Sequence, residues 1–255
     1  MALETIRVEF QDTLCVVEIH RPEAMNAINA RLIAEITGVL AECEEKSTIV
    51  VLRGSPEVFC FGADFGAIAD PPVGGADGEG GPAALFDLWS RLASGPYVTV
   101  SYVRGRVNAG GIGFVAASDI ALADATAKFS LSELLFGLHP ACVMPFLMRR
   151  IGLQRSHYLT LMTQPFDAAD AFRWGLVDAH DADGDSLLRR HLLRLRRLSK
   201  PAIRRYKDYM RMIGPPLSEL RSNAIAANTE VFSDAQNLAA IARYLQLGVF
   251  PWEKT

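Results

Sequence analysis

The sequence predicts an α/β fold with a mainly parallel sheet. Two observations support this class: short β-branched segments alternate with helical stretches, and glycine-rich turns directly follow two of those segments. At 255 residues the chain is long enough for one large domain, or for one domain with a helical appendage. Half of the residues are hydrophobic and 22% are charged, a balance typical of globular proteins.

The first predicted elements are a hairpin, a helix and a buried strand. The segments 5–10 and 14–19 alternate or are continuously apolar, which predicts two paired strands. In residues 26–45 apolar side chains from Ile28 onward recur at helical spacing. The apolar run 47–54 then predicts a short strand that ends at a glycine.

The same alternation continues through the middle of the chain. Strands are expected at 96–105 and 119–124, with a glycine turn and an apolar stretch between them. The preceding segment 69–84 holds three prolines and five glycines without periodicity, so we expect a mobile loop there. It fits a tolerated surface insertion or a lid over a site equally well.

The last third of the chain is predicted to be helical. We expect residues 1–186 to form the core with the catalytic site, and 187–255 to form a helical region of the kind that often makes oligomer contacts. Two helices there are expected to begin at serine caps, Ser218 and Ser233, and the second is expected to end at Gly248.

Composition excludes several classes of function. The net charge of −3 does not support a nucleic-acid-binding surface over the whole chain. The N-terminus lacks the pattern of a signal peptide and no apolar run approaches about 20 residues, so we expect a cytoplasmic protein without membrane contact. The cysteines are scattered without a CxxC pair, which argues against a metal site and a disulfide framework. They are Cys15, Cys43, Cys60 and Cys142.

Two turns share a design that suits an oxyanion. Residues 57–65 and 108–115 each run from a strand-like segment through glycine and small residues into a helix-compatible stretch. Small residues let a substrate oxygen approach the backbone, and amides at a helix start have no intrahelical partner. Two converging turns would form an oxyanion hole. Close packing of helix against strand explains the same glycines, whereas a dinucleotide fingerprint lacks its third glycine here.

Five segments resemble, in order, those of the crotonase (enoyl-CoA hydratase/isomerase) superfamily. They are HRPEAMNAIN (20–29), FCFGADF (59–65), the long stretch from NAGGIGF to LFGLHP (108–140), WGLVDA (174–179) and FSDAQN (232–237). The resemblance runs along practically the whole chain. It implies the ClpP-like spiral of repeated ββα units with a C-terminal helical trimerisation region, and a chemistry that stabilises a thioester enolate.

The resemblance also implies which residues form the catalytic site. The backbone N–H groups of Ala63 and Gly110 correspond to the two oxyanion donors, and Glu133 corresponds to the second catalytic glutamate of the hydratases. The place of the first glutamate is taken by Gly113. Because simple hydration in the family uses two glutamates, this departure puts ordinary hydratase activity in doubt. A lone glutamate suffices for a syn elimination, first as base and then as acid.

Within the superfamily, the chain is most similar to the hydroxymethylglutaryl-ACP dehydratases of polyketide β-branching cassettes. The stretches PEVFCFGADF (56–65) and GVFPWE (248–253) are among those that carry this likeness. The implied reaction is dehydration of 3-hydroxy-3-methylglutaryl-ACP to 3-methylglutaconyl-ACP. The acyl group would be carried on the phosphopantetheine of an acyl carrier protein or on CoA, and no metal or redox cofactor is implied.

A basic run suggests where an acidic carrier protein docks. Residues 189–207 hold nine Lys or Arg and no acid, on a chain that is otherwise acidic. We expect Arg194, Arg197, Arg204 and Arg205 to meet the carrier. A solvated helix face and a site for the phosphates of CoA are the alternatives.

The distal carboxylate of such a substrate needs a donor or a cation. Asn108, Gly111 and His139 are candidate substrate-binding residues because they lie within or near the second turn motif. Further candidates by proximity in sequence are Tyr97, Arg104 and Arg106. Each polar candidate fits a structural role as well, so the choice among them stays open.

Two other readings of function stay open. Another crotonase reaction, such as decarboxylation, isomerisation or hydration of an acyl-CoA or acyl-ACP, would use the same oxyanion donors. A non-catalytic RNA-binding or scaffolding member would keep the fold without turnover, but the low net charge and the presence of Glu133 argue against it. The resemblance further implies a homo-oligomer, either a trimer or a dimer of trimers.

Overall fold

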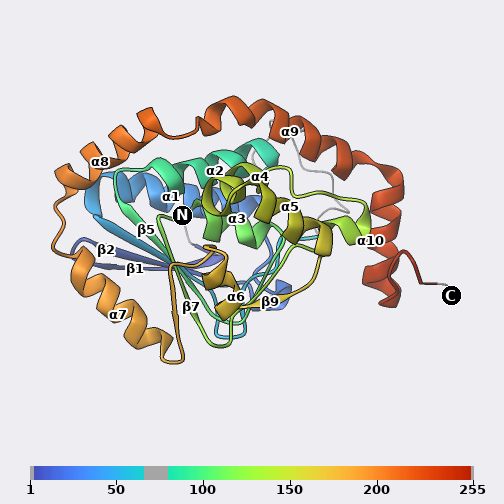
Figure 1. The fold of residues 1–255 in the computed structure, drawn as a ribbon, viewed down its shortest axis with the longest axis horizontal. Helices are drawn as coiled ribbons and strands as arrows, with labels where there is room; N and C mark the ends of the chain where they lie inside the picture. Colours follow the sequence, from blue (N-terminus) through green and yellow to red (C-terminus); the bar gives the residue numbers. More distant parts are fainter. Residues whose placement is uncertain (1–2, 66–79, 254–255) are drawn as a thin grey trace.

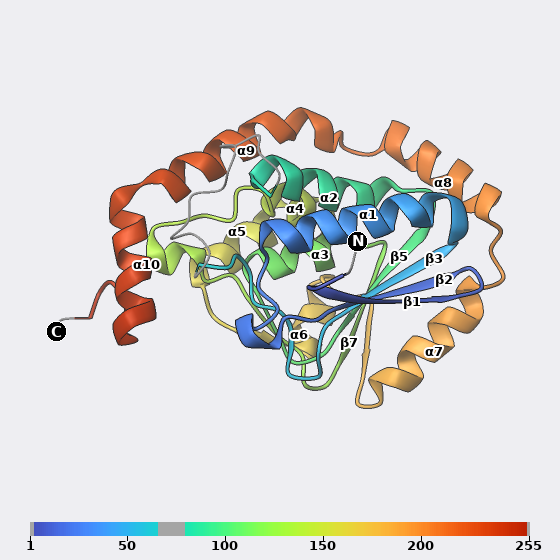
Figure 2. The same ribbon diagram turned by 180° about the vertical axis from the view of Figure 1, so that it is seen from behind.

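The computed structural model describes residues 3–65 and 80–253, which form two β-sheets covered by helices (Figures 1 and 2). Most of the loop expected at 69–84 lies outside the described residues. Its last part does not remain a loop, because a helix begins at Pro82. The expected α/β architecture with mainly parallel strands is confirmed.

The larger sheet has the strand order β1-β2-β3-β5-β7-β10. The hairpin β1-β2 is antiparallel, and every other neighbouring pair is parallel. The strands are β1 (Ile6–Gln11), β2 (Leu14–Ile19), β3 (Ile49–Arg53), β5 (Val98–Val103), β7 (Ile120–Asp124) and β10 (Ala179–Asp181). The smaller sheet has the order β4-β6-β8-β9, with the first three strands parallel. Its strands are β4 (Val58–Cys60), β6 (Arg106–Asn108), β8 (Lys128–Ser130) and β9 (Phe166–Asp167).

Helices cover both faces of the larger sheet and extend beyond it. In chain order they are α1 (Ala30–Lys46), α2 (Pro82–Ser94), α3 (Gly110–Ala117), α4 (Met144–Ile151), α5 (Leu153–Met162), α6 (Ala168–Arg173), α7 (Gly184–Leu195), α8 (Lys200–Ile213), α9 (Leu217–Ser233) and α10 (Ala235–Leu247). Two short 3-10 turns are η1 (Pro22–Ala24) and η3 (Glu133–Phe136). Helices α1 to α4 pack on one side of the larger sheet and α7 on the other, while α8 and α9 arch over the helical layer (Figures 1 and 2).

The chain repeats one unit, in which a strand of the larger sheet is followed by a strand of the smaller sheet and then by a helix. The units are β3-β4-α2, β5-β6-α3 and β7-β8 with η3 and α4. Consecutive units place their strands side by side and parallel in both sheets. The implied spiral of ββα units is therefore confirmed, whereas the trimerisation role of the C-terminal helices and the boundary at 186 stay predictions.

The start of α1 differs from the sequence prediction. The helix begins at Ala30, and the side chain of Asn29 caps it by accepting from the Leu32 N–H at 2.9 Å. Ile28, expected on the helix, instead forms a parallel β-bridge with Ala63. Its apolar side chain fits the helical period by coincidence, because the asparagine cap decides where the helix starts.

Both serine caps expected in the C-terminal region are wrong. Helix α9 begins at Leu217, so Ser218 already lies inside its first turn. Helix α10 is capped by Asp234, whose carboxylate accepts from two backbone N–H groups, and not by Ser233. A carboxylate is favoured at a helix start because it accepts hydrogen bonds and also interacts with the helix dipole. The predicted end at Gly248 is confirmed by its left-handed conformation.

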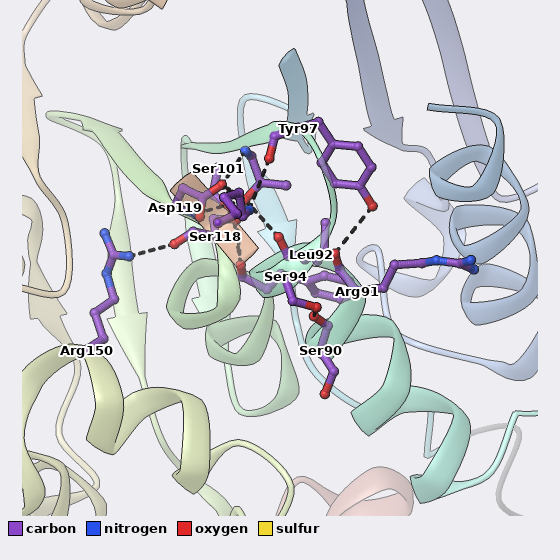
Figure 3. A network of polar contacts seen from close by, with 12 residues as sticks. Ser90, Arg91, Leu92, Ser94, Tyr97, Ser101, Ser118, Asp119 and Arg150 are labelled. Carbon is purple, nitrogen blue, oxygen red and sulfur yellow. Dashed lines mark hydrogen bonds and ion pairs between the residues drawn. The ribbon is translucent and has the colours of Figure 1, made fainter. Parts of the chain in front are cut away.

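A buried polar network fixes the C-terminal end of α3 (Figure 3). Asp119 accepts from the Thr99 N–H at 2.8 Å, and the hydroxyls of Ser101 and Ser118 lie 2.7 Å apart. The guanidinium of Arg150 donates to the Ser118 carbonyl at 2.8 Å. Because these groups are satisfied inside the protein, the network makes α3 a rigid support. The opposite end of this helix faces the candidate site.

Candidate active site

The ends of three strands place two turns and a carboxylate at one edge of the smaller sheet. Strands β4, β6 and β8 are adjacent and parallel, so the segments that follow them emerge at the same edge. Ala63 follows β4, Gly110 begins α3 after β6, and Glu133 begins η3 after β8. All three line one cavity of about 670 Å³. The fold thus brings the three predicted catalytic positions together.

The two glycine turns are in direct contact. A Cβ placed on Gly62 would lie 2.8 Å from Ala109 Cβ and 3.4 Å from the backbone nitrogen of Gly110, so only glycine allows this approach. Beside them, the Ile28 N–H donates to the Gly62 carbonyl at 2.7 Å, and the Ile28 carbonyl accepts from the Asp64 N–H at 2.9 Å. Successive N–H groups of an extended chain point to opposite sides. Because the Asp64 N–H points toward Ile28, the N–H of Ala63 faces away from it.

The two amides are available to a ligand. Within the described residues, neither the Ala63 N–H nor the Gly110 N–H donates a hydrogen bond. The peptide before Gly110 is held in an unusual conformation, because Ala109 has φ +50° and ψ −123°. Such a conformation costs about 1–3 kcal/mol and persists only where the surrounding structure imposes it. Here it sets the direction in which the Gly110 N–H points.

Glu133 is a buried carboxyl group with an incomplete set of partners. It begins η3, its residue is 8% exposed, and its Oε2 atom has no hydrogen-bond partner among the described residues. Burial removes water that would stabilise the carboxylate and so raises the pKa of Glu133 to about 7. A carboxyl group with this pKa both accepts and releases a proton readily near neutral pH.

Two asparagines hold the turn that carries Glu133. On one side, Asn108 Nδ2 donates to Ser132 Oγ at 2.9 Å, and Asn108 Oδ1 accepts from Ser130 Oγ at 2.7 Å. On the other side, Asn237 Nδ2 of α10 donates to the Gly137 carbonyl at 3.2 Å. Asn108, a candidate for substrate binding, does not line the cavity, and its amide is occupied by the serines.

The position of the missing first glutamate is filled by a tryptophan. A Cβ placed on Gly113 would lie 2.4 Å from Cζ2 of Trp89, so no side chain fits there without displacing the indole. Gly111, another candidate for substrate binding, is packed on β4: its Cβ would lie 2.3 Å from the Cys60 carbonyl oxygen. The structure therefore gives both glycines a packing role, and Gly111 does not line the cavity.

Other candidates divide between the cavity and the scaffold. His139, a candidate for substrate binding, is half-buried and lines the cavity. Cys142 also lines it, but burial raises the pKa of its thiol to about 12, which does not suit a nucleophile. Tyr97 is fully buried in the network around α3, and its hydroxyl donates to the Arg91 carbonyl at 3.3 Å (Figure 3).

The remaining arginine candidates also lie outside the cavity wall. The guanidinium of Arg104 lies 5.2 Å from the Tyr102 ring centre, and that of Arg106 lies 5.1 Å from the Phe61 ring centre. Neither arginine lines the cavity. Of the candidates for the distal carboxylate, the structure therefore leaves His139 at the cavity.

The four arginines predicted to meet a carrier are exposed at the α7–α8 end of the molecule (Figure 1). Within the described part of the chain, none of them forms an ion pair. Other members of the basic run are structural: Lys200 donates to the carbonyls of Cys43 and Ser47, and Lys207 donates to Asp119 at 2.6 Å. The basic run therefore contains both exposed arginines and lysines that form hydrogen bonds within the fold.

Sequence reasoning missed one element of the site. Helix α2 was not predicted, although Pro82 at its start, apolar residues at helical spacing and Gly95 after its end are all readable signals. It supplies Trp89 to the cavity. The polar residues Asn228, Thr229 and Ser233 of α9 also line the cavity, although the sequence analysis assigns none of them to the site.

The described residues contain neither a metal-ligand cluster nor a membrane-spanning helix. Across residues 3–65 and 80–253, no three or more His, Cys, Asp or Glu side chains are grouped as metal ligands. No helix in the same ranges combines the length and hydrophobicity needed to cross a membrane.

Comparisons with known proteins agree with this architecture. The model of the enoyl-CoA hydratase/isomerase family matches residues 9–255. The chain is 55% identical over 251 residues to the bacillaene synthase dehydratase PksH of Bacillus subtilis, covering 98% of this chain and 97% of that protein. It is 29% identical over 200 residues to the 1,2-epoxyphenylacetyl-CoA isomerase of Escherichia coli, covering 74% and 76%.

A solved structure has the same fold. The crystal structure of a Bacillus subtilis protein described as a polyketide biosynthesis enoyl-CoA hydratase superimposes with a TM-score of 0.92 at 52% identity. The superposition covers 98% of this chain and all of the other. The fold class inferred from the motifs is confirmed.

Proposed function

The chain belongs to the enoyl-CoA hydratase/isomerase family, and we propose that it dehydrates 3-hydroxy-3-methylglutaryl-ACP to 3-methylglutaconyl-ACP in polyketide β-branching. Its relatives show that the chain is an enzyme of the hydratase/dehydratase type. The Bacillus subtilis relative is a dehydratase of bacillaene synthase, which supports the finer assignment.

One observation carries the proposal: a buried carboxyl group with an unpartnered oxygen and two free backbone amides line the same cavity. The other carboxylate that lines this cavity among the described residues, Asp64, is paired with Arg21 at 2.8 Å. Glu133 supplies the carboxyl group, and Ala63 and Gly110 supply the amides. At Gly113, the indole of Trp89 leaves no space for a second carboxylate. An elimination in which one group serves as base and then as acid fits this arrangement better than a reaction that needs two carboxylates.

The steps follow from the chemistry of these groups. The thioester oxygen accepts hydrogen bonds from the Ala63 and Gly110 amides. Glu133, as a carboxylate, removes the proton on the carbon next to the thioester, and the electron pair moves onto that oxygen. The enolate then collapses, the β carbon–oxygen bond breaks, and the protonated Glu133 gives its proton to the departing hydroxyl. One water leaves, and Glu133 is a carboxylate again.

The two amides stabilise the enolate electrostatically. Removing a single donor from an oxyanion hole of another enzyme typically costs about 3–4 kcal/mol in the barrier. Amides fixed by β4 and by the start of α3 need no reorganisation when charge develops, so they stabilise the transition state more than the bound substrate.

The substrate and its carrier are assigned by complementarity. We propose that His139 interacts with the distal carboxylate and that Arg194, Arg197, Arg204 and Arg205 attract the acidic carrier protein. The phosphopantetheine thioester then enters the cavity without any metal or redox cofactor. We further propose that the protein works as a homo-oligomer, with a trimer as the basic unit.

One assay tests the reaction. Purified protein is incubated with 3-hydroxy-3-methylglutaryl-ACP, and the acyl-carrier product is weighed by mass spectrometry. We expect the loss of one water for the wild type and no change for Glu133→Gln. Loss of carbon dioxide instead would establish a decarboxylase, and full activity of the variant would refute the mechanism.

A further inference from the structure

Trp89, a residue that lines the cavity, carries an indole N–H without a hydrogen-bond partner among the described residues. Four buried side-chain atoms in the described residues lack a hydrogen-bond partner, and two of them, Trp89 Nε1 and Glu133 Oε2, belong to residues that line the cavity. One is a donor that cannot accept, and the other is an acceptor when Glu133 is ionised. Two residues that line the cavity therefore carry a complementary donor and acceptor.

Trp89 is held rigidly in place. Its residue is 1% exposed, and its indole meets the rings of Phe114 and Phe146 edge-on at 5.9 and 5.8 Å between ring centres. Gly113 lies against the edge of the indole that carries Cζ2 and Cε2, because its Cβ would be only 2.4 and 2.5 Å from these atoms. A donor held this way is already positioned before a ligand arrives.

An unpaired indole N–H carries a cost that an apolar side chain would avoid. Burying such a donor without a partner removes its hydrogen bond to water and gives nothing in return. A ligand oxygen in the cavity would remove that cost when it binds, and the group would then favour ligands that carry an acceptor at this point. The N–H is consequently suited to select a hydroxyl-bearing substrate.

We propose that the indole N–H of Trp89 donates a hydrogen bond to the β-hydroxyl oxygen of the substrate and keeps that oxygen beside Glu133 while it departs as water. The inference rests on the proposed dehydration. The indole keeps its proton throughout: Glu133 supplies the proton of the departing water, and the electron pair of the broken carbon–oxygen bond leaves with the oxygen. Trp89 therefore contributes binding and orientation, not acid catalysis.

An isosteric replacement tests the N–H without opening a cavity. Genetic incorporation of 3-benzothienylalanine at position 89 exchanges the indole N–H for sulfur and keeps the size of the ring. We expect kcat/KM for 3-hydroxy-3-methylglutaryl-pantetheine to fall about 10- to 100-fold, in line with the loss of a hydrogen bond to a developing charge. The same replacement at Trp174, which does not line the cavity, is the matched control and should leave it unchanged.

Binding to a non-reacting protein separates this inference from the proposed function. In the Glu133→Gln background, Trp89 should make the hydroxylated pantetheine thioester bind about 3- to 10-fold more tightly than 3-methylglutaryl-pantetheine, which lacks the hydroxyl. The benzothienyl variant should bind both equally. A wild type without dehydratase activity would overturn the proposed function. An active wild type with an equally active benzothienyl variant and unchanged selectivity would overturn the role of Trp89.

Discussion

Glu133 depends on poor solvation for its chemistry. Its carboxyl group is buried beside the cavity, and this burial raises its pKa to about 7. In water the same group would be a weak base and would be protonated only in acid. Desolvation thus gives the proposed proton shuttle a pKa near neutral.

The raised pKa predicts a pH profile. Because the base form of Glu133 starts the reaction, kcat/KM for dehydration should rise with pH and level off above about 7. Rates measured from pH 5 to 9 with a pantetheine thioester check this. A plateau that extends unchanged down to pH 5 would contradict the assigned base.

The same group predicts a pH-dependent stability. A carboxyl group whose pKa is raised on folding stabilises the protein fully below its unfolded-state pKa, and this contribution is lost as pH rises through the folded-state value. For Glu133 the window runs from about 4.5 to 7. Glu133→Gln should therefore be more stable than the wild type at pH 8, by about 3 kcal/mol at most, with the gain absent near pH 4. Urea unfolding at both pH values measures the difference.

The residue scale also shows the limits of sequence reasoning. Glu133, Ala63 and Gly110 could be identified because the motifs align them in order along the chain. The role of Asn108 could not, because sequence proximity to the glycine turn does not reveal that its amide is bonded to Ser130 and Ser132. Only the pairing of β6 with β8 brings those serines beside it.

At the scale of elements, the 3-10 turn η3 is clamped at both ends. Asn108 of β6 holds Ser132 just before the turn, and Asn237 of α10 holds Gly137 just after it. A Cβ on Gly137 would lie 2.1 Å from Asn237 Oδ1, so the contact is tight. Two distant segments of the chain thereby fix the position of one carboxylate.

The clamp predicts a loss of rate more than a loss of binding. Asn108→Ala and Asn237→Ala should each lower kcat about 10- to 100-fold and change KM less than threefold, because a carboxylate displaced by about 1 Å reacts far more slowly. Asn223→Ala, on the exposed face of α9, is the matched control. If KM rose while kcat held, the asparagines would be binding groups and not positioning residues. Thermal unfolding of the same variants separates a local effect from a loss of fold.

The alternation of strands and helices could be predicted from the sequence, whereas the signals of α2 are partly masked by the segment before it. Strands β3 and β7 are almost continuously apolar, and β5 is rich in β-branched residues, because both faces of these strands are buried, a pattern visible without the structure. Helix α2 follows directly on a stretch rich in glycine and proline, so its first turn falls within the segment 69–84 that the sequence predicts to be a loop. Trp89 was overlooked together with that helix.

At the scale of the whole molecule, the cavity and the basic surface lie apart. The cavity is lined by the N-terminal end of α1, whereas Lys200 at the start of α8 bonds to carbonyls at the C-terminal end of α1. A helix of 17 residues is about 25 Å long. Figures 1 and 2 both show α8 at one end of the molecule and α10 at the other. We therefore predict that a carrier docked on Arg204 and Arg205 serves a neighbouring chain of the proposed homo-oligomer.

This separation predicts complementation between two defective chains. Arg204→Glu with Arg205→Glu should raise KM for acyl-ACP about tenfold and spare the pantetheine substrate, because only the carrier meets these charges. When such chains are co-expressed with Glu133→Gln chains under different tags, the mixed oligomers should turn over acyl-ACP faster than either parent. The gain arises because an intact docking surface on one chain then serves an intact Glu133 on the next. If purified mixed oligomers turn over acyl-ACP no faster than the parents, the carrier docks on the chain that it serves. If the arginine substitutions raise KM equally for the pantetheine substrate, the arginines do not dock the carrier at all.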